Sequence, residues 1–346
     1  MLKRMTLALT MLFSAPLVQA APTVTGAGAT FPYPVYSRWA DDYQDAKGVA
    51  INYQGIGSGG GIAQIKARTV TFGASDVPMS AEDQQKDGLV QWPMIMGGVV
   101  PIVNLGSALN GTTLKLDGET LAAIYAGDIT HWNDAHIKAL NPGVNLPDTA
   151  ITPVHRAEGS GTNFLFTHYL SEVSPAFKKK VGEGNTVPWP TGIGAQANGG
   201  VAARVQGTNG AIGYVEYAYA RQNKVSTVVL KNRDGGYVTA GTDSFSAAAK
   251  HADWKHAPGL ALMLTNQPGK DSWPITGVSY ILMPIKPTDA DAAKAALSFF
   301  HWAYTSGGDT AASLDYVAMP KSVIEQVEKG VWTKIVEGNT PLRSAK

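Results

Sequence analysis

The sequence contains no cysteine among its 346 residues. This absence excludes disulfides, thiol nucleophiles, iron–sulfur clusters, cysteine zinc sites and a lipid-modified N-terminal cysteine. Neither charge is in excess, since 28 basic residues face 27 acidic residues. A balance so close to neutral argues against a protein that coats nucleic acid. The chain is long enough for about two domains, whose hydrophobic cores need no disulfide or other cross-link for stability.

Long apolar runs are missing once the first twenty residues are set aside. Lys3 and Arg4 precede a mostly apolar stretch that reaches Val18, and Ala20 closes it with a small side chain. This pattern predicts a secretory signal peptide over residues 1–20. No later stretch reaches the roughly 18 apolar residues that a membrane span needs. We expect an exported, soluble chain without a lipid anchor or a membrane span, with the periplasm as its compartment.

Histidine spacings typical of metal sites are absent too. The seven histidines form no H-E-x-x-H motif, and the pairs 131/136 and 251/256 are five residues apart, which does not place two ligands on one helix face. The eight tryptophans raise the alternative of carbohydrate binding, but they are scattered along the chain and favour packing roles. We expect no metal and no cofactor.

Glycine is abundant, with 38 residues in short clusters between β-rich and helical stretches. Ser80 resembles an N-cap, with Asp83 three residues later. The alternation predicts an α/β fold with mainly parallel sheets. We expect strands or apolar runs at 49–54, 69–74 and 97–105, and helices at 34–43, 60–68, 118–125, 163–170, 288–304 and 321–329.

Three segments share a strand, a turn of small and hydroxyl residues, and a helix start. They cover residues 26–32, 55–61 and 156–162, and they place Thr30, Ser58 and Ser160 with Thr162 where the helices open. Helix N-termini expose unpaired N–H groups, and glycines let a ligand approach the backbone. Three such corners, one carrying Arg156, indicate a bound oxyanion.

Two enzyme classes compete with this interpretation. Residues 55–60 fit G-x-G-x-x-G and Asp76 follows, as in a dinucleotide-binding fingerprint, but an exported chain with two further corners argues against it. Ser160 raises the second alternative, an exported hydrolase or phosphatase that would use this serine as its nucleophile. It lies in Gly-Ser-Gly, outside G-x-S-x-G, and His155 need not face it. The hydrolase stays open as the alternative from another class.

Together the corners resemble the periplasmic phosphate-binding proteins of bacterial ABC-type phosphate importers. The resemblance covers the mature chain through residues 25–32, 53–58, 72–76, 159–162, 211–216 and 273–276. It implies a type II periplasmic-binding-protein fold, with two α/β lobes joined by two hinge-strand crossings. The first lobe would comprise residues 21–98 and 276–346, and the second lobe residues 99–275.

The resemblance also implies the phosphate-binding residues, by position: Thr30, Phe31, Ser58, Asp76, Arg156, Ser160, Gly161 and Thr162. Asp76 would accept a hydrogen bond from the phosphate O–H and so reject unprotonated sulfate. Glu158 and Gly59 stand where relatives often carry Asp and Ser, and we expect Glu158 to pair with Arg156. The expected function is non-enzymatic delivery of phosphate to an inner-membrane permease. Another protonated tetrahedral oxyanion, such as arsenate, remains an alternative ligand.

Overall fold

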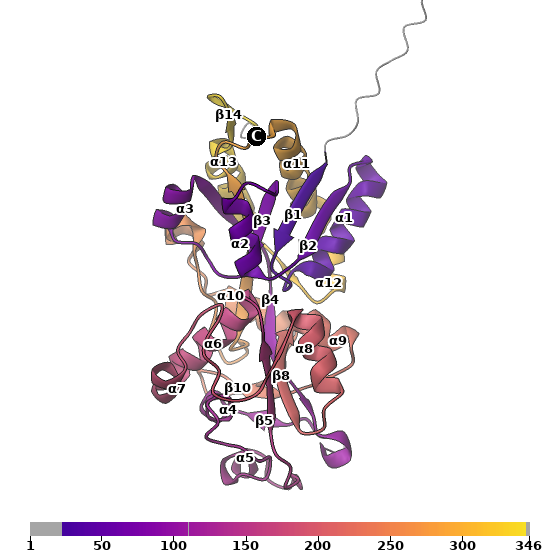
Figure 1. Ribbon diagram of the computed structural model, residues 1–346, viewed down its shortest axis with the longest axis vertical. Helices are drawn as coiled ribbons and strands as arrows, with labels where there is room; N and C mark the ends of the chain where they lie inside the picture. Colours follow the sequence, from indigo (N-terminus) through magenta and orange to yellow (C-terminus); the bar gives the residue numbers. More distant parts are fainter. Residues whose placement is uncertain (1–22, 110, 344–346) are drawn as a thin grey trace, which may run out of the picture.

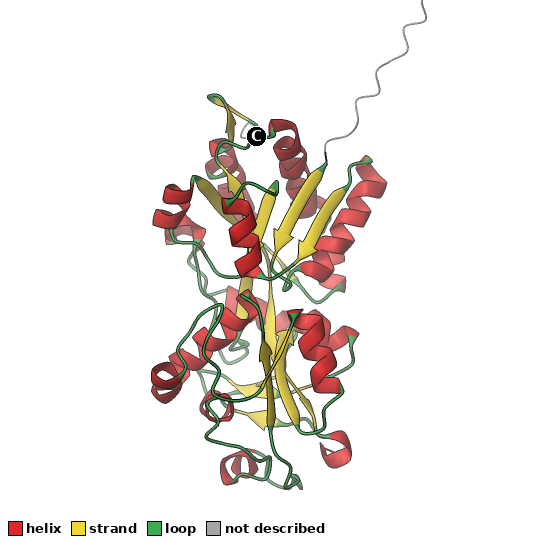
Figure 2. Cartoon of the chain, in the orientation of Figure 1, coloured by secondary structure: helices red, strands yellow, loops and turns green. Residues whose placement is uncertain are grey.

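The computed structural model describes residues 23–109 and 111–343, so the predicted signal peptide at 1–20 lies outside the described residues. Two lobes are stacked along the long axis of the molecule, and strand β4 (Leu89–Asn104) runs from one into the other (Figure 1). Helices flank the strands of both lobes on either side (Figure 2). The α/β class and the two-lobed architecture expected from the sequence are confirmed.

The upper lobe in Figure 1 contains both ends of the described chain. Its N-terminal elements are β1 (Val24–Gly28), α1 (Tyr33–Lys47), β2 (Ile51–Gly55), α2 (Ser58–Lys66), β3 (Phe72–Ser75) and α3 (Ala81–Asp87). Its C-terminal elements are β12 (Thr276–Pro284), α11 (Ala290–Ser306), α12 (Gly308–Ser313), β13 (Val317–Ala318), α13 (Lys321–Gly330), η4 (Trp332–Lys334), β14 (Val336–Glu337) and β15 (Thr340–Pro341).

The lower lobe is built from the middle of the chain. Its first elements are η1 (Gly106–Leu109), β5 (Lys115–Leu116), α4 (Gly118–Tyr125), α5 (Ala135–Leu140), β6 (Thr152–Arg156), α6 (Gly161–Val173), α7 (Pro175–Lys180), β7 (Ile193–Ala195) and α8 (Ala197–Gln206). The others are β8 (Ala211–Glu216), α9 (Tyr217–Gln222), β9 (Ser226–Thr227), β10 (Val229–Lys231), β11 (Tyr237–Val238) and α10 (Thr242–Ala249). The chain then passes through η2 (Trp254–His256) and η3 (Pro258–Leu260) on its way back to the first lobe, and η3 packs against α3 and β4.

Local sequence fixes several helix starts. Ser80 accepts a hydrogen bond from the Asp83 backbone N–H at 3.1 Å and caps α3, as predicted. Asp117 caps α4 in the same way at Thr120, and α4 has the predicted bounds. Asp289 caps α11, whose apolar face is buried against the first lobe's core. These helices begin where a side-chain oxygen can satisfy a free backbone donor.

The largest sheet is mixed, which corrects the expectation of mainly parallel sheets. Its strand order is β2-β1-β3-β12-β4-β8-β6-β7. The outer strands pair in parallel, β1 with β2 and β3, and β6 with β7 and β8. The central strands β12 and β4 are antiparallel to their neighbours. These two long strands carry the chain between the lobes, and their pairing is a long-range contact that local alternation does not encode.

Strand β4 changes its partner where the two lobes meet. It pairs with β12 up to Gly98, opposite Thr276, and with β8 from Val99, opposite Glu216. The backbone N–H of Val99 donates to the Ile275 carbonyl at 2.8 Å. The two crossings of the chain therefore lie side by side and are hydrogen-bonded to each other.

One segment before the second crossing already contacts the first lobe. The carbonyl of Gly259, in η3, accepts hydrogen bonds from the side-chain amides of Gln84 and Gln91 at 3.0 and 3.2 Å. The Tyr280 hydroxyl on β12 bonds both backbone groups of Leu262. Residues around 258–262, inside the range predicted for the second lobe, thus brace the first lobe beside the crossings.

Aromatic side chains fill the cores of both lobes. Trp92 packs edge-on against Phe300 and Trp332 in the first lobe. Trp132, in the second lobe, is fully buried and donates to the Gly210 carbonyl at 2.9 Å. This burial supports packing roles for these tryptophans. None of the helices within 23–109 and 111–343 is both long and apolar enough to cross a membrane.

Candidate functional site

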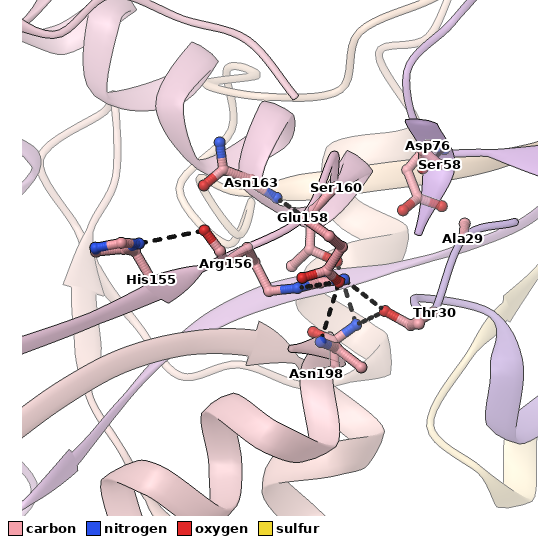
Figure 3. A network of polar contacts seen from close by, with 12 residues as sticks. Ala29, Thr30, Ser58, Asp76, His155, Arg156, Glu158, Ser160, Asn163 and Asn198 are labelled. Carbon is pink, nitrogen blue, oxygen red and sulfur yellow. Dashed lines mark hydrogen bonds and ion pairs between the residues drawn. The ribbon is translucent and has the colours of Figure 1, made fainter. Parts of the chain in front are cut away.

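The predicted site residues come together where the lobes face each other (Figure 3). In the first lobe, Thr30 and Phe31 follow β1, Ser58 opens α2 and Asp76 follows β3. Because β1, β2 and β3 are parallel, their carboxyl ends meet at one edge of the sheet. In the second lobe, Arg156 ends β6, Ser160 caps α6, and Gly161 and Thr162 form its first turn. All eight lie at this junction, and each is almost fully buried.

Two helix N-termini point into the junction from opposite lobes. Helix α2 begins at Ser58 and helix α6 at Gly161, with Ser160 as its N-cap. The first N–H groups of a helix have no partner within it, and they carry a partial positive charge. The junction therefore offers backbone donors from both sides, which suits an anion.

The backbone of Gly161 lies directly against side chains of the first lobe. A Cβ atom on this residue would lie 2.4 Å from Ser58 Oγ and 2.5 Å from Asp76 Oδ2. Ser58 Oγ in turn accepts a hydrogen bond from the Asp76 backbone N–H at 3.1 Å. The Gly59 N–H also donates across the junction to the Gly159 carbonyl at 2.9 Å. Only glycine at position 161 permits so close an approach.

Asp76 is a buried carboxyl without a hydrogen-bond partner. Neither of its carboxylate oxygens is bonded within the part of the chain that the structure describes. Burial raises the pKa of Asp76 to about 7, although Ser279, Arg156 and Ser58 nearby partly oppose the rise. A buried carboxylate left unpaired costs free energy unless a ligand supplies a donor. Asp76 is therefore a ready acceptor that faces the donors of the second lobe.

Arg156 is held in place by Glu158, as expected from the sequence. Glu158 Oε1 accepts from Arg156 Nε at 2.9 Å and also bonds Nη2. The same oxygen accepts from the Ala197 backbone N–H at 3.0 Å. Arg156 Nη2 donates to Thr30 Oγ1 at 3.1 Å, whereas the buried Nη1 has no partner among residues 23–109 and 111–343. One face of the guanidinium is thus fixed and the other is free to bind an anion.

Asn198 belongs to the site although sequence analysis did not find it. It lies in the first turn of α8, fully buried, and its side-chain amide donates to Thr30 Oγ1 (Figure 3) and to Thr162 Oγ1. Its surroundings, Gln-Ala-Asn-Gly-Gly before an apolar helix, repeat the design of the other corners. That repetition is the pattern that could have identified it.

Two tyrosines also join the lobes here and were missed. The Tyr219 hydroxyl on α9 donates to the Thr30 carbonyl at 2.7 Å. The Tyr316 hydroxyl contacts the Phe31 carbonyl at 2.7 Å and Glu216 Oε2 at 2.8 Å. Burial raises the pKa of Glu216 well above its usual range. No local sequence pattern links residues 100 or more positions apart, so these contacts required the fold.

Ser160 is not arranged as a nucleophile. Its hydroxyl accepts from the Asn163 backbone N–H at 3.1 Å and thereby caps α6. The His155 ring stacks on Trp189, with 5.4 Å between centroids, and its Nδ1 lies 3.2 Å from the Arg156 carbonyl oxygen. His155 points away from Ser160 (Figure 3). Activation of Ser160 by this histidine would need a different arrangement.

The glycines of residues 55–61 serve chain packing. Gly57 has φ +89°, and a Cβ there would meet the Gly159 carbonyl oxygen at 2.6 Å. A Cβ at Gly61 would lie 2.5 Å from Gly28 Cα, so glycine lets α2 pack onto β1.

Within the described ranges, no cluster of three or more His, Asp or Glu side chains could hold a metal ion.

Comparisons with known proteins identify the family of this chain. A family model described as "PBP superfamily domain" matches residues 15–306. A phosphate-binding protein PstS from Xylella fastidiosa is 51% identical over 305 residues, covering 88% of this chain and 84% of that protein. Another from Pasteurella multocida is 49% identical over 321 residues, covering 92% and 93%. The crystal structure of a phosphate-binding protein from Stenotrophomonas maltophilia superposes with a TM-score of 0.69 at 19% identity, covering 94% and 100%.

The superposition supports the fold class, a two-lobed α/β architecture. The high identity over nearly full lengths is more specific. This chain belongs to the PBP superfamily and, within it, to the family of phosphate-binding proteins PstS.

Proposed function

We propose that this protein binds inorganic phosphate between its two lobes and delivers it to the permease of an ABC importer. It acts as a binding protein without catalytic turnover. The protein acts in the periplasm, and residues 1–20 direct its export to this compartment. The relatives are named phosphate-binding proteins, which supports phosphate as the ligand. The observation that carries the proposal is chemical: the buried carboxylate of Asp76, neither oxygen of which is bonded within the described residues, faces a set of donors.

The donors come from both lobes and suit the unprotonated oxygens of phosphate. They are the backbone N–H groups at the starts of α2 and α6, the hydroxyls of Thr30, Ser58, Ser160 and Thr162, the Phe31 backbone and Arg156 Nη1. The Phe31 ring packs against Gly97, which leaves its backbone for the ligand. Phosphate near neutral pH retains at least one proton, and Asp76 accepts it in a hydrogen bond. Sulfate has no such proton, and its contact with a bare carboxylate would be repulsive.

We propose that the lobes divide at residues 98/99 and 275/276, where β4 changes partner, and that the cleft opens around these strands. A ligand that bonds groups of both lobes stabilises the closed arrangement. Entry and release of phosphate then require the contacts across the junction to break. The two adjacent, hydrogen-bonded crossings allow such a rotation without unfolding either lobe.

Equilibrium dialysis of the ligand-stripped mature chain with labelled phosphate tests the proposal. We expect one phosphate per chain, and a large excess of sulfate should leave it bound. Displacement by sulfate would remove Asp76 as a discriminator. Failure to retain phosphate, with retention of arsenate, would assign the site to another protonated oxyanion. Hydrolysis of a chromogenic phosphate ester would instead favour the phosphatase alternative.

A further inference from the structure

The four hydroxyl groups of the site share one feature: each accepts a hydrogen bond from a nitrogen donor of the protein. Ser58 Oγ accepts from the Asp76 N–H and Ser160 Oγ from the Asn163 N–H, both at 3.1 Å. Thr30 Oγ1 and Thr162 Oγ1 accept from Asn198 Nδ2, at 2.9 and 3.2 Å. A hydroxyl has one hydrogen to donate. When a nitrogen donor occupies one of its lone pairs, the O–H must point away from that donor, toward another acceptor.

The orientation of the Asn198 amide is fixed by its third contact. Asn198 Oδ1 accepts from the Glu216 backbone N–H at 3.0 Å. A backbone N–H can only donate, so the oxygen must face it and the NH2 group must face the two threonines. Each of the two amide hydrogens is thus committed to one threonine hydroxyl, one in each lobe.

Thr30 shows the consequence most clearly. Its Oγ1 accepts from Asn198 Nδ2 and also from Arg156 Nη2 at 3.1 Å. Both lone pairs are occupied by groups that can only donate, so the hydroxyl hydrogen must be donated. Within the described part of the chain, neither Thr30 Oγ1 nor Thr162 Oγ1 donates a hydrogen bond to another group.

We propose that Asn198 is a positioning residue that fixes the direction of the Thr30 and Thr162 hydroxyls, so that both donate to the bound anion. Asn198 does not touch the ligand; it acts through these two side chains. By committing both hydroxyls as donors, it makes this part of the site prefer oxygens that carry no proton. The inference rests on the proposed function, because it concerns how the same site distinguishes protonation states of phosphate.

A double-mutant cycle with Asn198→Ala and Thr162→Val tests this role by calorimetric titration with inorganic phosphate. Asn198→Ala should weaken phosphate binding about 10- to 100-fold, since two oriented donors are lost. In the Thr162→Val background its effect should shrink at least threefold, because one of its two targets is already missing. Asn232→Ala is the matched control. It removes another buried amide of the second lobe, bonded to the carbonyls of residues 269, 270 and 272, and should leave phosphate affinity unchanged.

Asn198→Asp tests the direction of the hydroxyls. The carboxylate can still accept from Glu216, but both hydroxyls then turn to donate to it and present lone pairs to the ligand. Affinity should fall more at pH 8, where phosphate is mainly the dianion, than at pH 6, where the monoanion carries two O–H groups. Within the described residues, the ionisable groups around this region are Asp76, Arg156, Glu158 and Glu216, together with the hydroxyls of Tyr219 and Tyr316.

Asn163→Asp controls for buried charge in the second experiment. Its side chain bonds the Gly184 carbonyl and Tyr214, and touches neither threonine hydroxyl. We expect a smaller difference between pH 6 and pH 8 for this variant than for Asn198→Asp. Equal pH dependence in the two variants, additive effects in the cycle, or phosphate binding by Asn198→Ala within twofold of the unchanged protein would each overturn the inference. If the unchanged protein binds no phosphate, the proposed function fails first and the inference fails with it.

Discussion

Asp76 is the buried carboxyl of the site whose oxygens have no hydrogen-bond partner within the described residues. We predict that Asp76→Asn lowers phosphate affinity by no more than about tenfold, because the amide oxygen can still accept a hydrogen bond. At pH 8, where the Asp76 carboxyl is mainly ionised, the same variant should bind sulfate about tenfold more tightly, since the repulsive carboxylate is gone. Competition between labelled phosphate and unlabelled sulfate measures both effects.

Glu158→Gln is the control for that experiment. Glu158 is the other carboxylate of the site, but it faces Arg156 and the start of α8. Loss of its charge should weaken the binding of both anions alike through a less firmly held Arg156. An Asp76→Asn variant that still excludes sulfate would show that Asp76 is not the discriminator.

The raised pKa of Asp76 gives sulfate rejection a pH dependence. With a pKa of about 7, this carboxyl becomes neutral as the pH falls below 7 and can then donate its own proton. Sulfate affinity should therefore rise about tenfold between pH 8 and pH 6 and level off below that. Asp76→Asn, which has no proton to gain, should show no such rise. Titrations with sulfate at four pH values would decide, and a flat profile for the unchanged protein would contradict the prediction.

At the scale of elements, helix α6 brings its first turn against the first lobe. We predict that Gly161→Ala weakens phosphate binding at least about 100-fold, because its Cβ would overlap Ser58 Oγ and Asp76 Oδ2 when the lobes close. The ligand-free protein should be as stable as before or slightly more so, since alanine favours a helix over glycine by about 1 kcal/mol. Calorimetry and thermal unfolding separate these effects.

Gly199→Ala provides the matched helical control. Gly199 lies in the first turns of α8, one residue beyond Asn198, and a Cβ there would meet only Tyr219 at 4.0 Å. Its phosphate affinity should stay within about twofold of the unchanged protein. Full-strength binding by Gly161→Ala would mean that the closed arrangement is not the one that holds the ligand.

Elements that depend on local chemistry could be predicted from the sequence. Caps such as Ser80, and a helix such as α4, follow from neighbouring residues alone. The turn residues of the corners carry the anion-binding chemistry in their own types, so Thr30 and Ser58 could be proposed before the fold was known. Their grouping in one junction agrees with those proposals, while their contact with phosphate stays a prediction.

Elements that depend on distant partners could not be predicted. All residues of β4 but the last are buried, so its sequence shows no alternation that would mark its length or its antiparallel partners. Strand β12 meets it from almost 200 residues away. Asn198 and Tyr219 acquire their roles only when α8 and α9 are placed opposite β1. Such roles belong to the pairing of segments, which one sequence without its fold does not encode locally.

At the scale of the whole molecule, several of the hydrogen bonds that hold the two lobes together meet at Thr30. Its hydroxyl accepts from Arg156 and Asn198, and its carbonyl accepts from Tyr219, all three from the opposite lobe. A surface ion pair between Arg221 and Asp315, 3.5 Å apart, adds little because it is exposed. The balance between open and closed forms should therefore respond to buried hydrogen bonds at Thr30 more than to surface charge.

We predict that Tyr219→Phe weakens phosphate binding about fivefold although Tyr219 lies outside the set of ligand donors. The variant loses one buried hydrogen bond between the lobes, worth about 1 kcal/mol, only in the closed form. The loss should appear as faster phosphate release, measured by stopped-flow displacement, because closure holds the ligand in. Tyr217→Phe on the same helix is the control, since no hydrogen bond of its hydroxyl is found within residues 23–109 and 111–343. Equal release rates in the two variants would show that closure is governed by the ligand's own contacts, and a slower rate in Tyr219→Phe would mean that this tyrosine favours the open form.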